Sequence, residues 1–215
     1  WRQAQLINIS GLFEVTEGVY QIRNLDLSNM TIIEGKEGIT VVDPLVSAET
    51  AKVGMDLYYK NRGKKPVVAV IYTHSHVDHY GGVRGVIDEA DVKSGKVKIY
   101  APAGFLEEAV SENIMAGNVM SRRASYMYGN LLKPDVKGQV GAGLGTTTSA
   151  GTVTLIAPTN YITKTGQKET IDGLTYDFLM APGSEAPSEM LWFIEEKKLI
   201  ETAEDVTHTL HNTYS

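Results

Sequence analysis

The sequence contains no cysteine among its 215 residues. This absence excludes disulfide bonds, thiolate metal ligands and a cysteine nucleophile, and it leaves the cellular compartment open. The chain also lacks a G-x-S-x-G nucleophile elbow, so the serine chemistry of an α/β-hydrolase is not indicated. Any hydrolytic chemistry must therefore come from other groups.

Basic tracts and long apolar runs are also missing. The formal net charge is −6, so nucleic acids and anionic membrane surfaces are not expected as partners. An anionic substrate remains compatible with this charge if a metal ion or a local arginine supplies a positive field. No apolar segment approaches the roughly 20 residues that span a bilayer. No signal-peptide pattern follows Trp1, and we therefore expect a processed or excised piece of a longer protein.

The chain length and its 42% of hydrophobic residues predict one globular domain, residues 1–215, with a real core. Turn residues separate short β-rich segments in both halves, and helices are expected between these halves. This order predicts an α/β protein with two sheets. The expected strands cover residues 12–15, 19–23, 30–34, 39–42, 66–72, 97–100, 153–156, 169–171, 174–180 and 190–194, and the expected helices cover residues 47–61, 103–115 and 118–129.

Three of the five histidines lie within six residues, in the stretch His74-Ser75-His76-Val77-Asp78-His79. The continuous apolar run before it is typical of a strand buried on both faces, and Gly81-Gly82 after it indicates a tight turn followed by a helix. Imidazole and carboxylate groups are ligands for zinc, iron and manganese. Desolvated polar groups this close together would repel one another unless a cation bound them. The stretch therefore predicts a metal site where a buried strand ends.

This motif resembles the metallo-β-lactamase superfamily, whose members place two metals at the edge of a four-layer αββα sandwich. The resemblance implies that His74 and His76 bind one metal while Asp78 and His79 bind the other. Asp43, which ends a β-rich segment before Pro44, has two interpretations. It is either a turn-capping carboxylate or the superfamily's first acidic motif, which supports the site without binding metal.

Two glutamates in the second half extend the resemblance to one branch. Most superfamily members place a histidine and a bridging aspartate where this chain has Glu185, in Pro182–Pro187, and Glu204. Glutamates at these two points resemble the motifs of one branch, the type III alkylsulfatases, which are the SDS hydrolases of bacteria. Residues 121–124 and 207–212 also resemble motifs of that branch. By this resemblance Glu185 completes the first metal site and Glu204 bridges both metals. Without it, either glutamate would be assigned to the solvated surface.

The resemblance implies a hydrolase of alkyl sulfate esters that uses two zinc ions and a metal-bound hydroxide, with Asp78 and His79 in catalytic roles. Its substrate would be a small molecule, contacted or supported by Asp43, Arg122, His208, His211 and Asn212. Residues 113–129, rich in Met, Tyr and Arg, are compatible either with the core or with an apolar substrate channel. The glycine-rich residues 133–152 fit no phosphate-binding fingerprint, and we expect a long ordered loop over the site.

Family members continue through a further histidine ligand, a helical dimerisation region and a lipid-carrier-like domain. From this we expect a sandwich that is incomplete at its C-terminal end, an incomplete second zinc site, at most one well-occupied metal with little or no turnover, and a homodimer only for a longer chain. The family resemblance places such enzymes in the periplasm or outside the cell. Two alternatives remain: an iron-dependent oxidoreductase on the same scaffold, and a catalytically inactive metal-binding domain.

Overall fold

Short apolar segments form two β-sheets in the computed structural model, which describes residues 2–207. The larger sheet has seven strands in the order of the chain: β1 (Gly11–Thr16), β2 (Val19–Arg23), β3 (Met30–Glu34), β4 (Ile39–Val42), β5 (Val67–Ile71), β6 (Lys98–Pro102) and β7 (Asn160–Ile162). The smaller sheet has the order β11-β10-β9-β8, with β8 (Gln167–Ile171), β9 (Leu174–Met180), β10 (Met190–Ile194) and β11 (Leu199–Glu201).

The larger sheet changes from antiparallel to parallel pairing at β4. Strands β1 to β4 pair antiparallel, whereas β4 to β7 pair parallel. Parallel strands present their carboxyl ends at the same edge, so the segments that follow β4 and β5 begin side by side. This arrangement places Asp43 next to the histidine-rich stretch.

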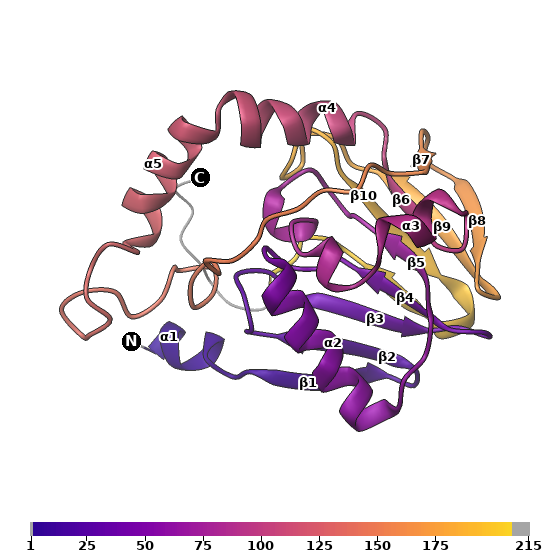
Figure 1. The fold of residues 1–215 in the computed structure, drawn as a ribbon, viewed down its shortest axis with the longest axis horizontal. Helices are drawn as coiled ribbons and strands as arrows, with labels where there is room; N and C mark the ends of the chain where they lie inside the picture. The colour runs from indigo at the N-terminus through magenta and orange to yellow at the C-terminus, as the bar shows by residue number, and fades with distance from the viewer. Residues whose placement is uncertain (1, 208–215) are drawn as a thin grey trace.

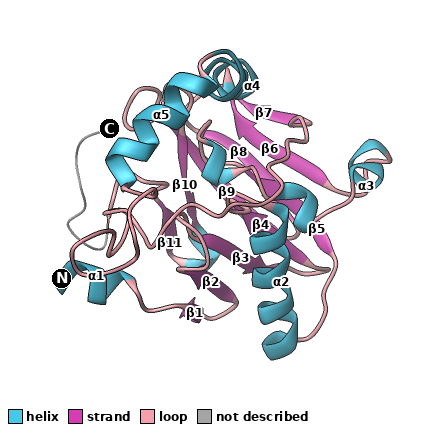
Figure 2. Ribbon diagram, turned by 60° about the vertical axis from the view of Figure 1, so that its left-hand side comes forward, coloured by secondary structure: helices cyan, strands magenta, loops and turns pink. Residues whose placement is uncertain are grey.

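Helix α2 (Ala48–Arg62) covers the outer face of the larger sheet (Figure 2). Its first turn is capped by Ser47, whose Oγ accepts a hydrogen bond from the Thr50 backbone nitrogen at 3.3 Å. Gly63, at φ 82°, ends the helix in a conformation that glycine adopts without strain. Met55 and Tyr58 are buried against the sheet, and each contributes roughly 1.5–3 kcal/mol of hydrophobic stabilisation.

The remaining helices lie mainly around the connections that follow β5 and β6. They are α1 (Arg2–Ile7), α3 (Glu89–Lys93), α4 (Phe105–Val110) and α5 (Gly117–Tyr128), with 3₁₀ turns at Val77–His79, Val83–Gly85 and Glu195–Lys197 and a π-helical turn at Ser111–Met115. Helix α5 extends away from both sheets (Figure 1). Every helix in residues 2–207 falls short of the length and apolar character that crossing a bilayer requires.

The main core lies between the two sheets. Val42 and Ile71 of the larger sheet contact a group of large side chains on the smaller sheet, among them Tyr176, Phe178 and Trp192. On the outer face of the smaller sheet, by contrast, Leu179, Phe193 and Ile200 are exposed. Within the described residues the layers are therefore helix, sheet and sheet, as expected for a sandwich that lacks its last helical layer.

Three local predictions were wrong. Residues 153–156 were expected to form a strand, but they pair with no strand of either sheet. Thr154 is instead hydrogen-bonded to the Gly81 carbonyl oxygen at 2.7 Å. The helix expected after Gly82 is a single 3₁₀ turn, followed by the short α3. Helix α5 contains no buried residue, so the core interpretation of its Met and Tyr residues fails.

Candidate metal centre

Four segments that carry candidate ligands leave the two sheets and converge. Asp43 follows β4 directly, and residues 72–79 follow β5. In the smaller sheet, β9 leads into residues 181–189, and β11 leads into residues 202–204. Because these strands are fixed by their ladders, side chains distant in sequence meet at defined positions.

One group of ligands contains His74, His76, Glu185 and Glu204, whose ligand atoms all lie within 4.8 Å of one another. Glu185 Oε2 is 3.0 Å from His76 Nδ1 and 3.5 Å from His74 Nε2. Glu204 Oε2 is 3.9 Å from His74 Nε2. The structure brings together the four residues predicted for the first metal.

The second group contains Asp78, His79 and Glu204. His79 Nε2 lies 3.4 Å from Asp78 Oδ2 and 3.4 Å from Glu204 Oε1. Glu204 thus faces both groups with its two oxygens, which is the arrangement that a bridging carboxylate needs. Metal binding by these six residues stays a prediction, but the geometry that it requires is present.

Asp43 fixes the protonation of the two buried histidines. Its Oδ2 accepts hydrogen bonds from His79 Nδ1 at 2.7 Å and from Thr73 Oγ1 at 2.6 Å, while Oδ1 accepts from the Thr73 backbone nitrogen at 2.8 Å. Since the Thr73 hydroxyl donates to Asp43, it accepts at 2.8 Å from His74 Nδ1. When either imidazole is neutral, it therefore keeps its proton on Nδ1 and presents the Nε2 lone pair to the cluster.

The Nε2 atoms of His74 and His79 are buried and have no hydrogen-bond partner among the described groups. A buried polar atom without a partner costs free energy, and native structures rarely keep one without a reason. Here two such atoms point toward carboxylates, and imidazole with carboxylate is a common donor set for transition metals. The residues fit a pair of metal ions.

The surrounding charges separate the pKa values of the histidines. Burial and the positive charges of His79 and His76 hold the pKa of His74 well below its ordinary range, so His74 is neutral. Burial also opposes protonation of His79, but the charges of Asp78 and Asp43 outweigh it and its pKa is raised. His74 is thus the histidine that needs to lose no proton before binding a metal.

His76 differs because it faces two carboxylates. Burial lowers its pKa, but the hydrogen bond to Glu185 and the charges of Glu185, Glu112 and Asp78 raise it to about 9. Glu112 Oε2 lies 3.9 Å from His76 Nε2, on the side opposite Glu185. A carboxylate at the outer nitrogen of a ligating imidazole orients the ring. Glu112 belongs to the π-helical turn, and no sequence pattern indicated it.

The sequence also predicted site residues beyond the two ligand groups. Arg122 is exposed on α5 and forms no ion pair with any residue that the structure describes. The neighbouring Arg123 is instead the one whose charge acts on Glu112. His208, His211 and Asn212 lie outside the described residues.

A cavity of about 580 Å³ opens beside the cluster. Asp43, His79, Glu185 and Glu204 are among the polar residues that line it. Its apolar part is contributed by Leu6, Ile9, Phe13, Met127, Leu144 and Val206. The glycine-rich loop therefore reaches the site, as predicted, and α5 contributes a methionine to the cavity rather than to the core.

Glu201 and Arg23 also line this cavity, and the sequence indicated neither. Burial and the charge of Asp43 raise the pKa of Glu201 to about 7. Arg23 stacks its guanidinium group 4.9 Å from the centre of the Phe13 ring, and it is the only arginine or lysine among the described residues that line the cavity.

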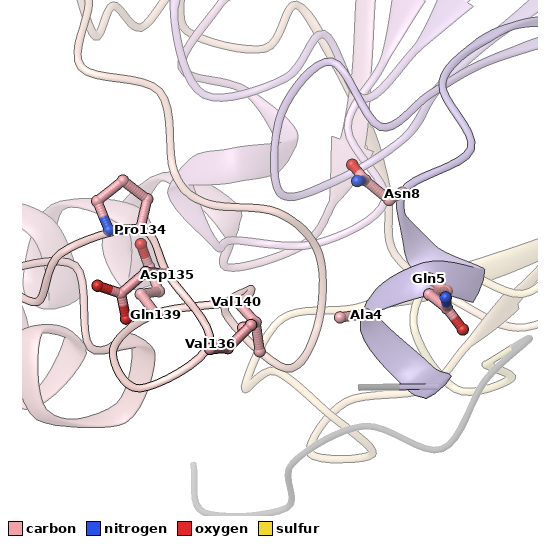
Figure 3. A pocket seen from close by; sticks show the side chains of 8 residues that line it. All are labelled: Ala4, Gln5, Asn8, Pro134, Asp135, Val136, Gln139 and Val140. Carbon is pink, nitrogen blue, oxygen red and sulfur yellow. The ribbon is translucent and has the colours of Figure 1, made fainter.

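A separate hollow of about 380 Å³ lies between α1 and the loop 134–140 (Figure 3). Gln5 comes from the helix and Asn8 follows its last residue, while Asp135 and Gln139 come from the loop. Among the residues that the structure describes, its lining contains no histidine and one carboxylate, that of Asp135, which is not the donor set of the metal centre.

Comparison with known proteins agrees with this geometry. Residues 23–162 match the family described as the Metallo-beta-lactamase superfamily. The whole chain is 78% identical to a linear primary-alkylsulfatase of a Pseudomonas species, of which it covers 32%, and 57% identical to an alkyl/aryl-sulfatase of Saccharomyces cerevisiae, of which it covers 33%. The chain thus spans about a third of the length of these relatives.

A solved structure shows the same fold at high similarity. It is the stereoselective inverting sec-alkylsulfatase Pisa1 from a Pseudomonas species, with a TM-score of 0.91 and 53% sequence identity over 94% of this chain and 32% of that one. The predicted fold and the resemblance to alkylsulfatases are confirmed by these similarities.

Proposed function

Because the chain belongs to the metallo-beta-lactamase superfamily, we propose that it hydrolyses alkyl sulfate esters with the help of metal ions bound at the strand exits. The observation that carries this proposal is the cavity beside the cluster. One part of its wall is lined by the candidate ligands and another by apolar side chains, and an alkyl sulfate has the same division between a charged head and an apolar chain. The alkylsulfatase relatives support the same substrate class.

The residues divide into three roles. His74, His76 and Glu185 would hold one ion, Asp78 and His79 the other, and Glu204 both. We propose zinc, which binds nitrogen and oxygen ligands of this kind. Such ions would lower the pKa of bound water and neutralise charge on the sulfate group.

The protein itself would orient the ligating histidines and provide an apolar surface for the substrate. Asp43 and Thr73 keep the Nδ1 protons of His79 and His74 in place, so both ligating atoms face the ions. The apolar lining takes up the alkyl chain, and hydrolysis then yields an alcohol and inorganic sulfate. Dodecyl sulfate is the substrate that the family resemblance predicts.

The test is a chain-length series. Metal-loaded protein is assayed for release of inorganic sulfate from n-alkyl sulfates. We expect kcat/KM to rise with each added methylene until the alkyl chain covers the whole apolar lining of the cavity. Full burial of one methylene contributes about 0.8 kcal/mol, so the increase reaches at most about fourfold per methylene.

Leu144→Ala removes part of the cavity lining and should flatten this series, whereas Leu131→Ala, in an exposed position of the same connection, should leave it unchanged. Because the 215 residues alone are expected to turn over little or no substrate, the same series is run on a longer chain that spans the full length of the relatives. The absence of sulfate release from this longer chain at every alkyl length would contradict the proposal. Oxygen uptake by iron-loaded protein would instead support the oxidoreductase, which the similarity to alkylsulfatases does not favour.

A further inference from the structure

Glu189, the residue before β10, is a fully buried carboxylate outside the predicted ligand set. A buried charge is costly unless strong hydrogen bonds satisfy it. Among the described residues Glu189 forms no ion pair, and its Oε1 has no partner. Its stabilisation therefore depends on the donors that reach Oε2.

Three donors converge on Glu189 Oε2, and all come from one turn. The Ser184 hydroxyl donates at 2.8 Å, and the backbone nitrogens of Glu185 and Ala186 each donate at 2.9 Å. The turn is closed by a hydrogen bond from the Gly183 nitrogen to the Ala186 carbonyl oxygen at 2.8 Å. Glu189 thus holds the backbone of Glu185 on both sides of its Cα atom.

The main chain of Glu189 is fixed to a different ligand. Glu189 forms an isolated antiparallel bridge with His74, and the nitrogen of Met190 donates to the Thr73 carbonyl oxygen at 3.0 Å. One residue therefore connects the exit of β5, which carries His74, to the turn that carries Glu185.

We propose that Glu189 is a positioning residue that sets Glu185 against His74 and His76 for binding of the first metal. The inference rests on the proposed metal site, and it adds a role that the ligand set does not contain. Glu185 is itself only partly buried, so without the turn its side chain could rotate into solvent. Loss of an outer hydrogen-bond partner typically weakens metal affinity by about 10–100-fold.

Three substitutions test this role. Glu189→Gln keeps an acceptor oxygen for the turn but removes the charge, so it should weaken binding of the first metal by about tenfold. Glu189→Ala removes the acceptor and should weaken it by about 100-fold. Ser184→Ala deletes one donor from an exposed position, which makes it the safest variant for folding, and should give a smaller loss in the same direction.

Ser188→Ala is the matched control. Its hydroxyl is buried in the same segment and donates to the Ala103 carbonyl oxygen at 2.9 Å, away from the turn. This variant loses a buried hydrogen bond, and hence stability, without touching the support of Glu185.

The experiment is a titration with Co²⁺, followed by its visible absorption, on the unaltered protein and the four variants. The expected order of affinity is unaltered protein and Ser188→Ala first, then Ser184→Ala, Glu189→Gln and Glu189→Ala, with a changed cobalt spectrum in the Glu189 variants. Equal affinities and spectra for the Glu189 and Ser188 variants would overturn the role of Glu189 and leave the metal site intact. If the unaltered protein binds no Co²⁺, both the inference and the metal site of the proposed function are wrong.

Discussion

Replacing Asp43 by asparagine should weaken the second metal site by changing the proton position on His79. Asp43 accepts three hydrogen bonds, two of them at Oδ2 from Thr73 Oγ1 and His79 Nδ1. An asparagine whose carbonyl oxygen takes the place of Oδ1 must put its amide nitrogen where Oδ2 was. That nitrogen donates, so His79 Nδ1 must accept, and the ring proton moves to Nε2, the atom that should bind the metal.

The magnitude follows from the contacts that are lost. A hydrogen bond to a charged group contributes about 1.5–3 kcal/mol. The substitution removes the charged acceptor from two such bonds, those that Oδ2 accepts from Thr73 and His79. The free energy of unfolding of the metal-free Asp43→Asn protein should therefore fall by roughly 3–6 kcal/mol. Affinity for the second metal should fall by about 10–100-fold, because His79 must abandon its preferred tautomer to bind.

Asp26→Asn provides a matched control. Asp26 is also a buried aspartate, and it accepts hydrogen bonds from the backbone nitrogens of Leu27, Val46 and Ser149 at 2.9–3.2 Å, but from no histidine within residues 2–207. Urea unfolding measures the loss of stability in both variants, and a Co²⁺ titration measures metal affinity. The reasoning is refuted if Asp43→Asn and Asp26→Asn lose similar stability and both retain the Co²⁺ affinity of the unaltered protein.

Three further outcomes are expected. Gly82→Ala should reduce the free energy of unfolding by about 1–3 kcal/mol, because a Cβ atom would collide with the Pro44 carbonyl oxygen. Gly117→Ala places its Cβ atom in open space and should have little effect, so equal urea midpoints for the two variants would contradict this prediction. Apparent Co²⁺ affinity of the first site, which His76 is expected to share with the neutral His74, should rise about tenfold per pH unit up to about pH 9 and then level off, because the proton of His76 no longer competes; a pH-independent affinity of this site would exclude this competition. Chelation should abolish sulfate release, and added Zn²⁺ should restore it; activity that survives exhaustive chelation would remove the metal from the reaction.

The sequence predicts most of the larger sheet and the local half of the site. Strand β5 is recognisable because a parallel strand buried on both faces must be continuously apolar, and the residues that follow it are contiguous. Glu185 and Glu204 are different. Nothing in their spacing connects them to His74, and only the resemblance to alkylsulfatases assigned them before the structure placed them within reach.

Other features depend on contacts that no local pattern encodes. The β-branched residues of 153–156 suit a strand, but strand propensity does not select a partner, and β6 pairs with residues 160–162 instead. The apolar residues of α5 indicate an amphipathic helix without saying what its apolar face contacts. Glu189 and Glu112 are similarly invisible, because their importance lies in the residues that they face across the fold.

The supports of the cluster explain how side chains of like charge remain together. Asp43, at the end of β4, holds Thr73 and His79, which follow β5; Glu189, at the start of β10, holds the turn of Glu185 and pairs with His74. Asp43 and Glu189 each connect segments that lie next to strand ends. The strand pairing therefore holds the ligands in place against their mutual repulsion. A metal that arrives therefore meets ligands that are already positioned, and little of its binding energy is needed to order them.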